Sequence, residues 1–141
     1  MRLLLAFLII PFTSFCQTDA HQVPKEILVG GIHKAKLYYS VSGTDTNYIL
    51  KYLPKTEREN FYEPIYFSSQ NGTLDNFYVI MKSFFTADHR KDKEYKVAFM
   101  LGNTHIVASN QKNMGGNQVR FWTTKGAIYL DERQVDKLFG K

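Results

Sequence analysis

The sequence has very little cysteine: Cys16 is the only one among its 141 residues. A single thiol excludes an intramolecular disulfide, even in a compartment that would allow one to form. It also excludes the metal sites that are built from closely spaced cysteines. The fold must therefore be held together by its hydrophobic core.

Proline is scarce as well, with 4 copies, and the apolar fraction of 44% is ordinary for a globular protein. These values argue against a disordered chain. The one long apolar run, Leu3 to Ile10, is far shorter than the roughly 20 residues that cross a bilayer. We therefore expect no membrane span.

The N-terminal apolar run has the features of a secretory signal peptide. Arg2 supplies the positive charge, and the apolar region follows it. The small residues Ser14 and Cys16 stand at alternate positions before the expected cleavage, which falls after Cys16. We predict that residues 1–16 are removed and that Gln17 becomes the first residue. The predicted localisation is periplasmic or secreted.

Cys16 leaves one alternative open, a lipid anchor. The bacterial lipobox also places a cysteine just after the apolar region, where the thiol is acylated. That pattern is usually Leu three residues before the cysteine and a small residue directly before it, and here these positions hold Thr13 and the bulky Phe15. Cleavage without lipidation is therefore favoured, and lipidation is the minor alternative.

The remaining chain is organised as one domain. Residues 17–26 are polar and predict a flexible mature N-terminus. Residues 27–141 contain no repeat, low-complexity tract or linker, and their length is typical of a single domain. Phe and Tyr, with 11 and 9 copies, favour strands and supply large buried areas.

Alternating hydrophobicity predicts strands on both sides of a central helix. A short strand over residues 27–29 is expected to end at Gly30, and alternating runs around residues 42–46 predict a β-hairpin. Pro64 indicates an edge strand, because proline cannot donate to a ladder. Residues 110–118 are polar and contain two glycines, so we expect a mobile loop there.

The clearest pattern is helical and begins at Thr73, the expected N-cap. Apolar residues then recur at spacings of three and four through residue 87. This stripe consists of Leu74, Phe77, Tyr78, Met81, Phe84 and Phe85. Asp131 is expected to cap a short C-terminal helix. The predicted class is α+β: a mostly antiparallel sheet of six or seven strands, backed by the helix over residues 73–87 and closed by the C-terminal helix.

Residues for catalysis or metal binding do not form a recognisable motif. The histidines are far apart, and none has a partner at a metal-ligand spacing. They are His21, His33, His89 and His105. No serine lies in a nucleophile elbow, and the acidic cluster over residues 57–63 is interpreted as a solvated surface. We therefore predict no catalytic residue, no metal and no cofactor.

Aromatic residues beside basic ones are the pattern that points to a ligand. Trp122 and Arg120 alternate out of phase with Phe121, so they share the outer face if Phe121 faces the core. Such residues anchor interfaces and stack on ligands. We predict a binding site at Trp122 and Arg120, with Tyr38 as a candidate neighbour. Burial of Trp122 under a loop or the C-terminal helix is the alternative.

The predicted function is a non-enzymatic binding or interaction module of the cell envelope or medium. Its partner is expected to be a protein or a glycan, and not nucleic acid, because the protein is expected to be exported. The basic residues that give the net charge of +5 are scattered along the chain. Two alternatives remain open. One is a small hydrolase with a site assembled from distant residues, and the other is a structural envelope protein without a ligand.

We predict that the protein isolated from its host begins at Gln17 or its cyclised form, because the signal pattern ends at Cys16. Mass spectrometry of the intact protein measures this directly. Recovery of a chain with intact Met1 from the cytoplasmic fraction would contradict export, and a diacylglyceryl group on Cys16 would establish the lipoprotein alternative.

Overall fold

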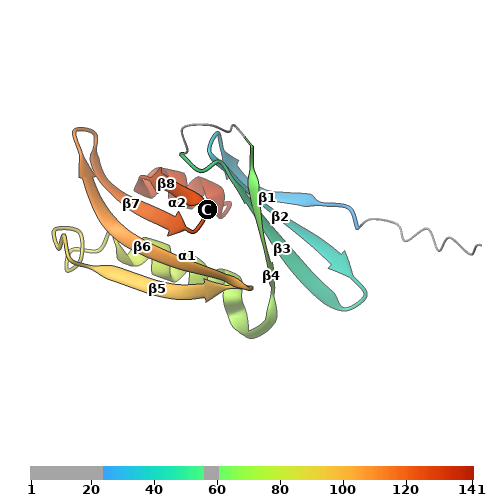
Figure 1. Ribbon diagram of the computed structural model, residues 1–141. Coiled ribbons are helices and arrows are strands. Elements are labelled where there is room, and N and C mark those ends of the chain that lie inside the picture. Colours follow the sequence, from blue (N-terminus) through green and yellow to red (C-terminus); the bar gives the residue numbers. More distant parts are fainter. Residues whose placement is uncertain (1–23, 56–60) are drawn as a thin grey trace, which may run out of the picture.

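The computed structural model describes residues 24–55 and 61–141 (Figure 1). The predicted signal peptide, residues 1–16, lies outside the described residues. The same holds for most of the predicted flexible segment 17–26, for His21, and for Glu57 and Glu59 of the acidic cluster.

The described residues form eight strands in two antiparallel sheets, each with its strands in chain order. The first sheet contains β1 (Ile27–Ile32), β2 (Ala35–Ser42), β3 (Asp45–Tyr52) and β4 (Glu63–Ser68). The second contains β5 (Lys96–Leu101), β6 (Thr104–Asn113), β7 (Gly116–Thr123) and β8 (Gly126–Leu130). A 3₁₀ turn, η1 (Gln70–Gly72), leads into α1 (Thr73–Ser83), and α2 (Glu132–Leu138) follows the second sheet.

The α+β class and the antiparallel pairing are confirmed, but the prediction of one sheet with six or seven strands is wrong. Each strand pairs with the next one along the chain through a short connection, so the hydrogen bonding is local. After β4 the chain enters α1, and β4 and β5 become edges of different sheets. Alternation in a sequence indicates strands, but it does not say which strands pair.

Local differences from the sequence prediction have simple physical reasons. β1 continues through Gly30 to Ile32: the register shifts by a bulge between Leu28 and Gly30, and Gly30 pairs with Leu37. The expected loop at residues 110–118 is instead the end of a long hairpin, because backbone pairing between β6 and β7 does not need apolar side chains. Gly72, with φ of +64°, is the N-cap of α1, and the Thr73 hydroxyl donates to the Gln70 carbonyl.

Two sequence signals at the ends of elements are confirmed. β4, which contains Pro64, pairs only with β3 and is an edge strand. Asp131 forms a capping box at the start of α2: its carboxylate accepts from the Gln134 backbone N–H at 2.8 Å, and the Gln134 side chain accepts from the Asp131 N–H at 3.0 Å.

The described residues share one core, in which Phe77 of α1 is central. Its ring centroid lies 4.9 Å from that of Phe139, 6.1 Å from that of Phe121 and 6.3 Å from that of Phe67. These residues belong to the C-terminal end of α2, the second sheet and the first sheet. One side chain therefore joins the inner faces of both sheets, and the described residues form a single small domain.

The C-terminal helix packs on the sheet that it does not follow. α2 leaves the second sheet and contacts β1 and β2 of the first. Gly30 allows this close approach, because a Cβ there would collide with the backbone carbonyls of Lys137 and Leu138. In Figure 1 both helices lie behind β5–β8, so the opposite side of the second sheet is left uncovered by helix.

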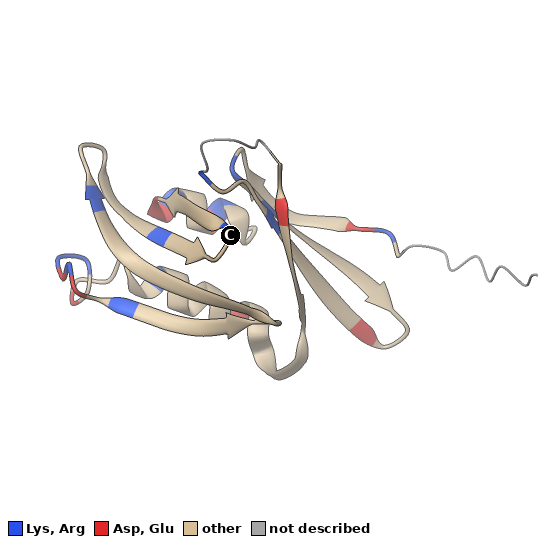
Figure 2. Cartoon of the chain, in the orientation of Figure 1, with Lys and Arg blue, Asp and Glu red and all other residues tan. Residues whose placement is uncertain are grey.

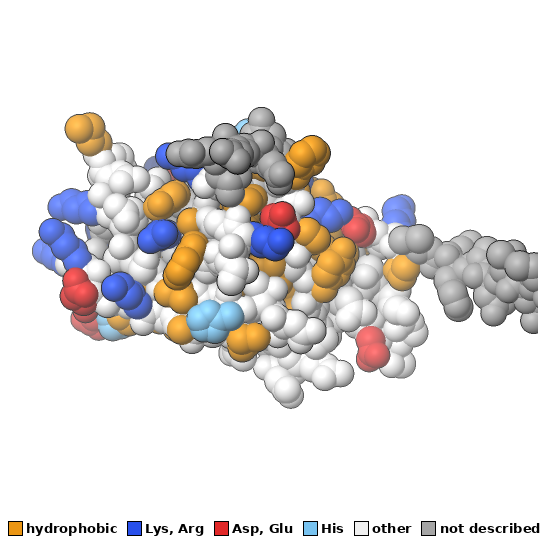
Figure 3. Space-filling view, in the orientation of Figure 1, with side chains coloured by type: hydrophobic (Ala, Val, Ile, Leu, Met, Phe, Trp, Pro, Cys, Tyr) orange, Lys and Arg blue, Asp and Glu red, His pale blue; other side chains and the backbone are white. Residues whose placement is uncertain are grey.

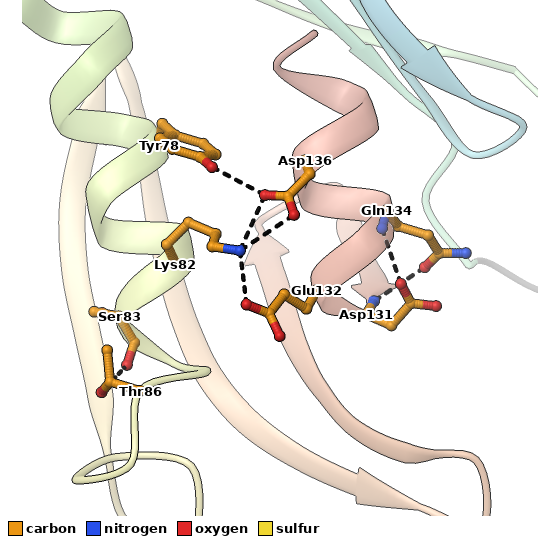
Figure 4. A network of polar contacts seen from close by, with 8 residues as sticks. All are labelled: Tyr78, Lys82, Ser83, Thr86, Asp131, Glu132, Gln134 and Asp136. Carbon is orange, nitrogen blue, oxygen red and sulfur yellow. Dashed lines mark hydrogen bonds and ion pairs between the residues drawn. The ribbon is translucent and has the colours of Figure 1, made fainter. Parts of the chain in front are cut away.

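A polar network ties α1 to α2 (Figure 4). The Lys82 Nζ lies 2.7 Å from Glu132 and 3.0 Å from Asp136, and the Tyr78 hydroxyl donates to Asp136 at 2.9 Å. The hydrogen bond from Lys82 holds the pKa of Asp136 below its ordinary value. Burial works against the charge of Lys82, but the hydrogen bonds from its ammonium to Glu132 and Asp136 prevail and raise its pKa.

We predict that Phe77→Ala lowers the free energy of unfolding by about 3–5 kcal/mol, the usual loss when a buried aromatic ring is truncated. Urea denaturation measures the change. Val79→Ala is the matched control, since Val79 lies on the same helix and is exposed. Equal effects of the two substitutions would mean that the stripe containing Phe77 is not core.

We also predict that Asp136→Asn destabilises the protein by roughly 0.5–1 kcal/mol at neutral pH, the usual range for a partly exposed ion pair. Because the pKa of Asp136 is lower in the folded state, its stabilisation exists above the ordinary pKa of 3.8 and is lost as the pH falls further. The variant and the native chain should therefore converge in acid. Asp45→Asn, at an exposed position on β3, is the control. A difference that stays constant down to acid pH would contradict this role.

Candidate binding surface

The outer face of the second sheet is the surface that lies opposite the core. Strand register places two neighbouring rows of side chains across it. One row is Ala98, Val107, Trp122 and Ala127, and the other is Lys96, Ser109, Arg120 and Tyr129. Val119, Phe121 and Thr123, which alternate with Arg120 and Trp122 on β7, are all buried. The outer face thus combines an exposed indole with two cations and a phenol.

Trp122 and Arg120 form a pair on this face. Trp122 is 46% exposed, and the guanidinium carbon of Arg120 lies 5.5 Å from the centroid of its ring. This is within the range of a cation–π interaction, which holds the indole and the guanidinium side by side. The Nε of Arg120 is buried, and no described residue accepts a hydrogen bond from it. A buried donor without an acceptor lowers the stability of the folded state, because it loses its hydrogen bonds to water and gains none in return.

The structure brings two of the three predicted site residues together and separates the third. Tyr38 lies on β2, on the outer face of the first sheet, where the Lys51 Nζ is 4.8 Å from its ring centroid. The alternative of a buried Trp122 does not hold, since the indole is half-exposed and α2 lies on the opposite side of the sheet. The site therefore centres on Arg120 and Trp122.

A groove of about 670 Å³ borders the same face next to β8. Residues 53–55, which follow β3, form part of its wall, and the Lys55 N–H donates to the Ala127 carbonyl at 2.9 Å. Its lining includes amides and basic side chains: Gln111, Asn113, Gln118, His33, Lys34 and Lys55. Tyr129, the cross-strand neighbour of Arg120, also lines it. None of the described lining residues is acidic.

The charge of the second sheet is of one sign. All 13 acidic residues of the chain lie outside residues 95–130, while this stretch contains Lys96, Lys112, Arg120 and Lys125. In Figure 2, β5–β8 accordingly carry basic but no acidic positions, and in Figure 3 hydrophobic side chains on this face lie beside Lys and Arg. The sequence prediction missed this asymmetry because it considered the charge of the whole chain. A count of acids along the chain would have revealed it.

The outer face of the first sheet offers a second group of exposed side chains. Tyr66 is 64% exposed and shares a row with Leu28, Tyr38 and Ile49. Lys51, a cation on the same face, is paired with Glu26 at 2.5 Å, and the hydrogen bond raises the pKa of Lys51. This face has aromatic area, and its positive charge is compensated in part: Lys51 is paired with Glu26, while its cross-strand neighbour Lys36 lies 5.9 Å from the ring centroid of Tyr62.

The described histidines lie in three separate places. His33 borders the groove, His105 is exposed on the outer face of β6, and the His89 ring stacks on Tyr95 at a centroid distance of 3.8 Å. Among residues 24–55 and 61–141, no group of three potential metal ligands is found. Within the same residues, no helix has the length and apolar character needed to cross a membrane.

Comparison of the chain with protein-family models, curated proteins and solved structures gives no match. The function must therefore be argued from the chemistry of the surface.

Proposed function

We propose that this chain is an exported, non-enzymatic binding module, and that its ligand docks on the outer face of the second sheet. The observation that carries the proposal is the Arg120–Trp122 pair: a half-exposed indole with a guanidinium 5.5 Å from the centroid of its ring. Trp and Arg are the residues that most often dominate binding energy at interfaces. The adjoining groove supplies additional polar contacts on the same side of the molecule.

The lining of the groove favours binding over catalysis. General acid–base chemistry needs a titratable group within reach of a partner that tunes or assists it. His33 borders the groove, yet the described lining residues supply no carboxylate for it to work with. A purely structural role would not explain why the indole of Trp122 is half-exposed. Binding by the Arg120–Trp122 face accounts for both features.

We predict that Trp122→Ala leaves the melting temperature nearly unchanged but abolishes binding of the native ligand. Exposed substitutions usually change stability by no more than about 0.5 kcal/mol. Trp122 is the single tryptophan of the chain, so its emission reports on this face alone. Emission of the native chain should be quenched by iodide, and polysaccharide or peptide fractions from the host envelope that bind should protect it.

Tyr66→Ala is the matched control, because it removes an exposed aromatic residue from the outer face of the first sheet. It should leave binding intact. A blue-shifted emission that iodide does not quench would contradict the proposal, as would a ligand whose binding is lost in Tyr66→Ala and retained in Trp122→Ala.

A further inference from the structure

We infer that the ligand of this face is an anionic polysaccharide, which lies across the second sheet from Lys96 to the groove beside β8. The inference rests on the proposed binding function and gives it a ligand class.

The charge of the face favours a negatively charged partner. The sheet contains no acidic residue, and its outer face presents Lys96 and Arg120 in one row. Lys34 and Lys55 extend the positive charge along the groove. Side chains of a single sign raise the local concentration of oppositely charged ligands and speed their association. Lys96 has one acidic neighbour, Glu94, which precedes β5 and lies 4.0 Å from the Lys96 Nζ, with both side chains exposed. On the first sheet, Lys51 is paired more closely with Glu26, at 2.5 Å.

The Arg120–Trp122 pair fits a sugar that carries an acidic group. The planar guanidinium of Arg120 can bind a carboxylate through the paired N–H donors of its terminal nitrogens, whereas its Nε is buried and does not reach the surface. The indole is an amphipathic platform with an apolar face that can cover the C–H side of a sugar ring. One sugar unit can therefore use both side chains at once, its ring on Trp122 and its carboxylate on Arg120.

The row and the groove fit an extended polymer. The row Lys96, Ser109, Arg120 and Tyr129 crosses four strands, which at roughly 4.8 Å between strands amounts to about 14 Å. It leads into the groove, where the amides of Gln111 and Gln118 can donate to and accept from hydroxyl groups. Several linked sugars can occupy this path, whereas a folded protein partner would need a larger apolar centre with few charges.

The test uses polygalacturonate, which carries a carboxylate on every sugar, and its methyl ester, which lacks the charges but keeps the sugars. We expect Trp122 emission to change on addition of the acidic polymer and the affinity to fall at high salt. The methyl ester should bind at least tenfold more weakly. Lys96→Gln with Arg120→Lys should weaken binding of the acidic polymer about tenfold or more, because the pair of substitutions removes one charge and the guanidinium fork.

The control variant Lys137→Gln removes one charge from α2, on the other side of the molecule, and so matches the net charge of the test variant. It should bind normally. Equal weakening in both variants would overturn the inference, because binding would then follow net charge alone. Single-stranded DNA that binds more tightly than polygalacturonate would also overturn it, as would an absence of binding by the acidic polymer.

The failure of the inference can be told apart from the failure of the proposed function. If the methyl ester binds as tightly as the acid, and Trp122→Ala abolishes both, the anionic ligand class is wrong while the binding face stands. If Trp122→Ala binds every envelope ligand as the native chain does, the binding face itself is wrong.

Discussion

The contact of Phe77 with both sheets and with Phe139 is the interaction on which the rest of the structure depends. Each sheet is a meander with one apolar face, and the strands of a sheet cannot cover that face themselves. Burial of that area supplies the main favourable term of folding. Phe77 reaches both inner faces from one helix, so that the two meanders become one domain without a cysteine in the described chain.

The position of α2 follows from the same constraint. The helix leaves the second sheet but covers β1, and Gly30 makes room for its last carbonyls. The Lys82 network then sets the relative position of the two helices from their polar sides. Since the inner faces take up both helices, the outer faces are left to the solvent. The location of the candidate site is in this sense a consequence of how the core is closed.

Much of the local structure could be predicted from sequence, because its causes are local. The helical stripe around Phe77, the capping by Asp131 and the edge position of Pro64 each depend on a few neighbouring residues. Alternation likewise placed Trp122 and Arg120 on one face of β7. The division into two sheets could not be predicted this way, because strand pairing joins residues through hydrogen bonds that side-chain alternation does not encode.

Of the candidate site, too, only the part that depends on neighbouring residues could be predicted from the sequence. Arg120 and Trp122 are two residues apart on one strand, so their proximity is a property of the strand itself. Tyr38 belongs to the other sheet, and its distance from Trp122 depends on the whole fold. The groove is built where residues 33–34 and 53–55 of the first sheet meet β8, a contact between segments far apart in the chain. A local sequence pattern does not predict a contact between such distant segments.

The sheet edges explain why a ligand is expected on a face. Exposed edges readily pair with foreign strands, and proteins block them with prolines, charges, bulges or covering segments. Here β4 carries Pro64, β5 begins with Lys96, and β1 contains a bulge after Leu28. The Ala127 carbonyl on β8 is occupied by the Lys55 N–H. Each edge thus has a feature that opposes strand addition, whereas the outer face of the second sheet keeps a half-exposed indole beside a guanidinium. A partner that docks on this surface would therefore contact side chains and not the backbone of a strand edge.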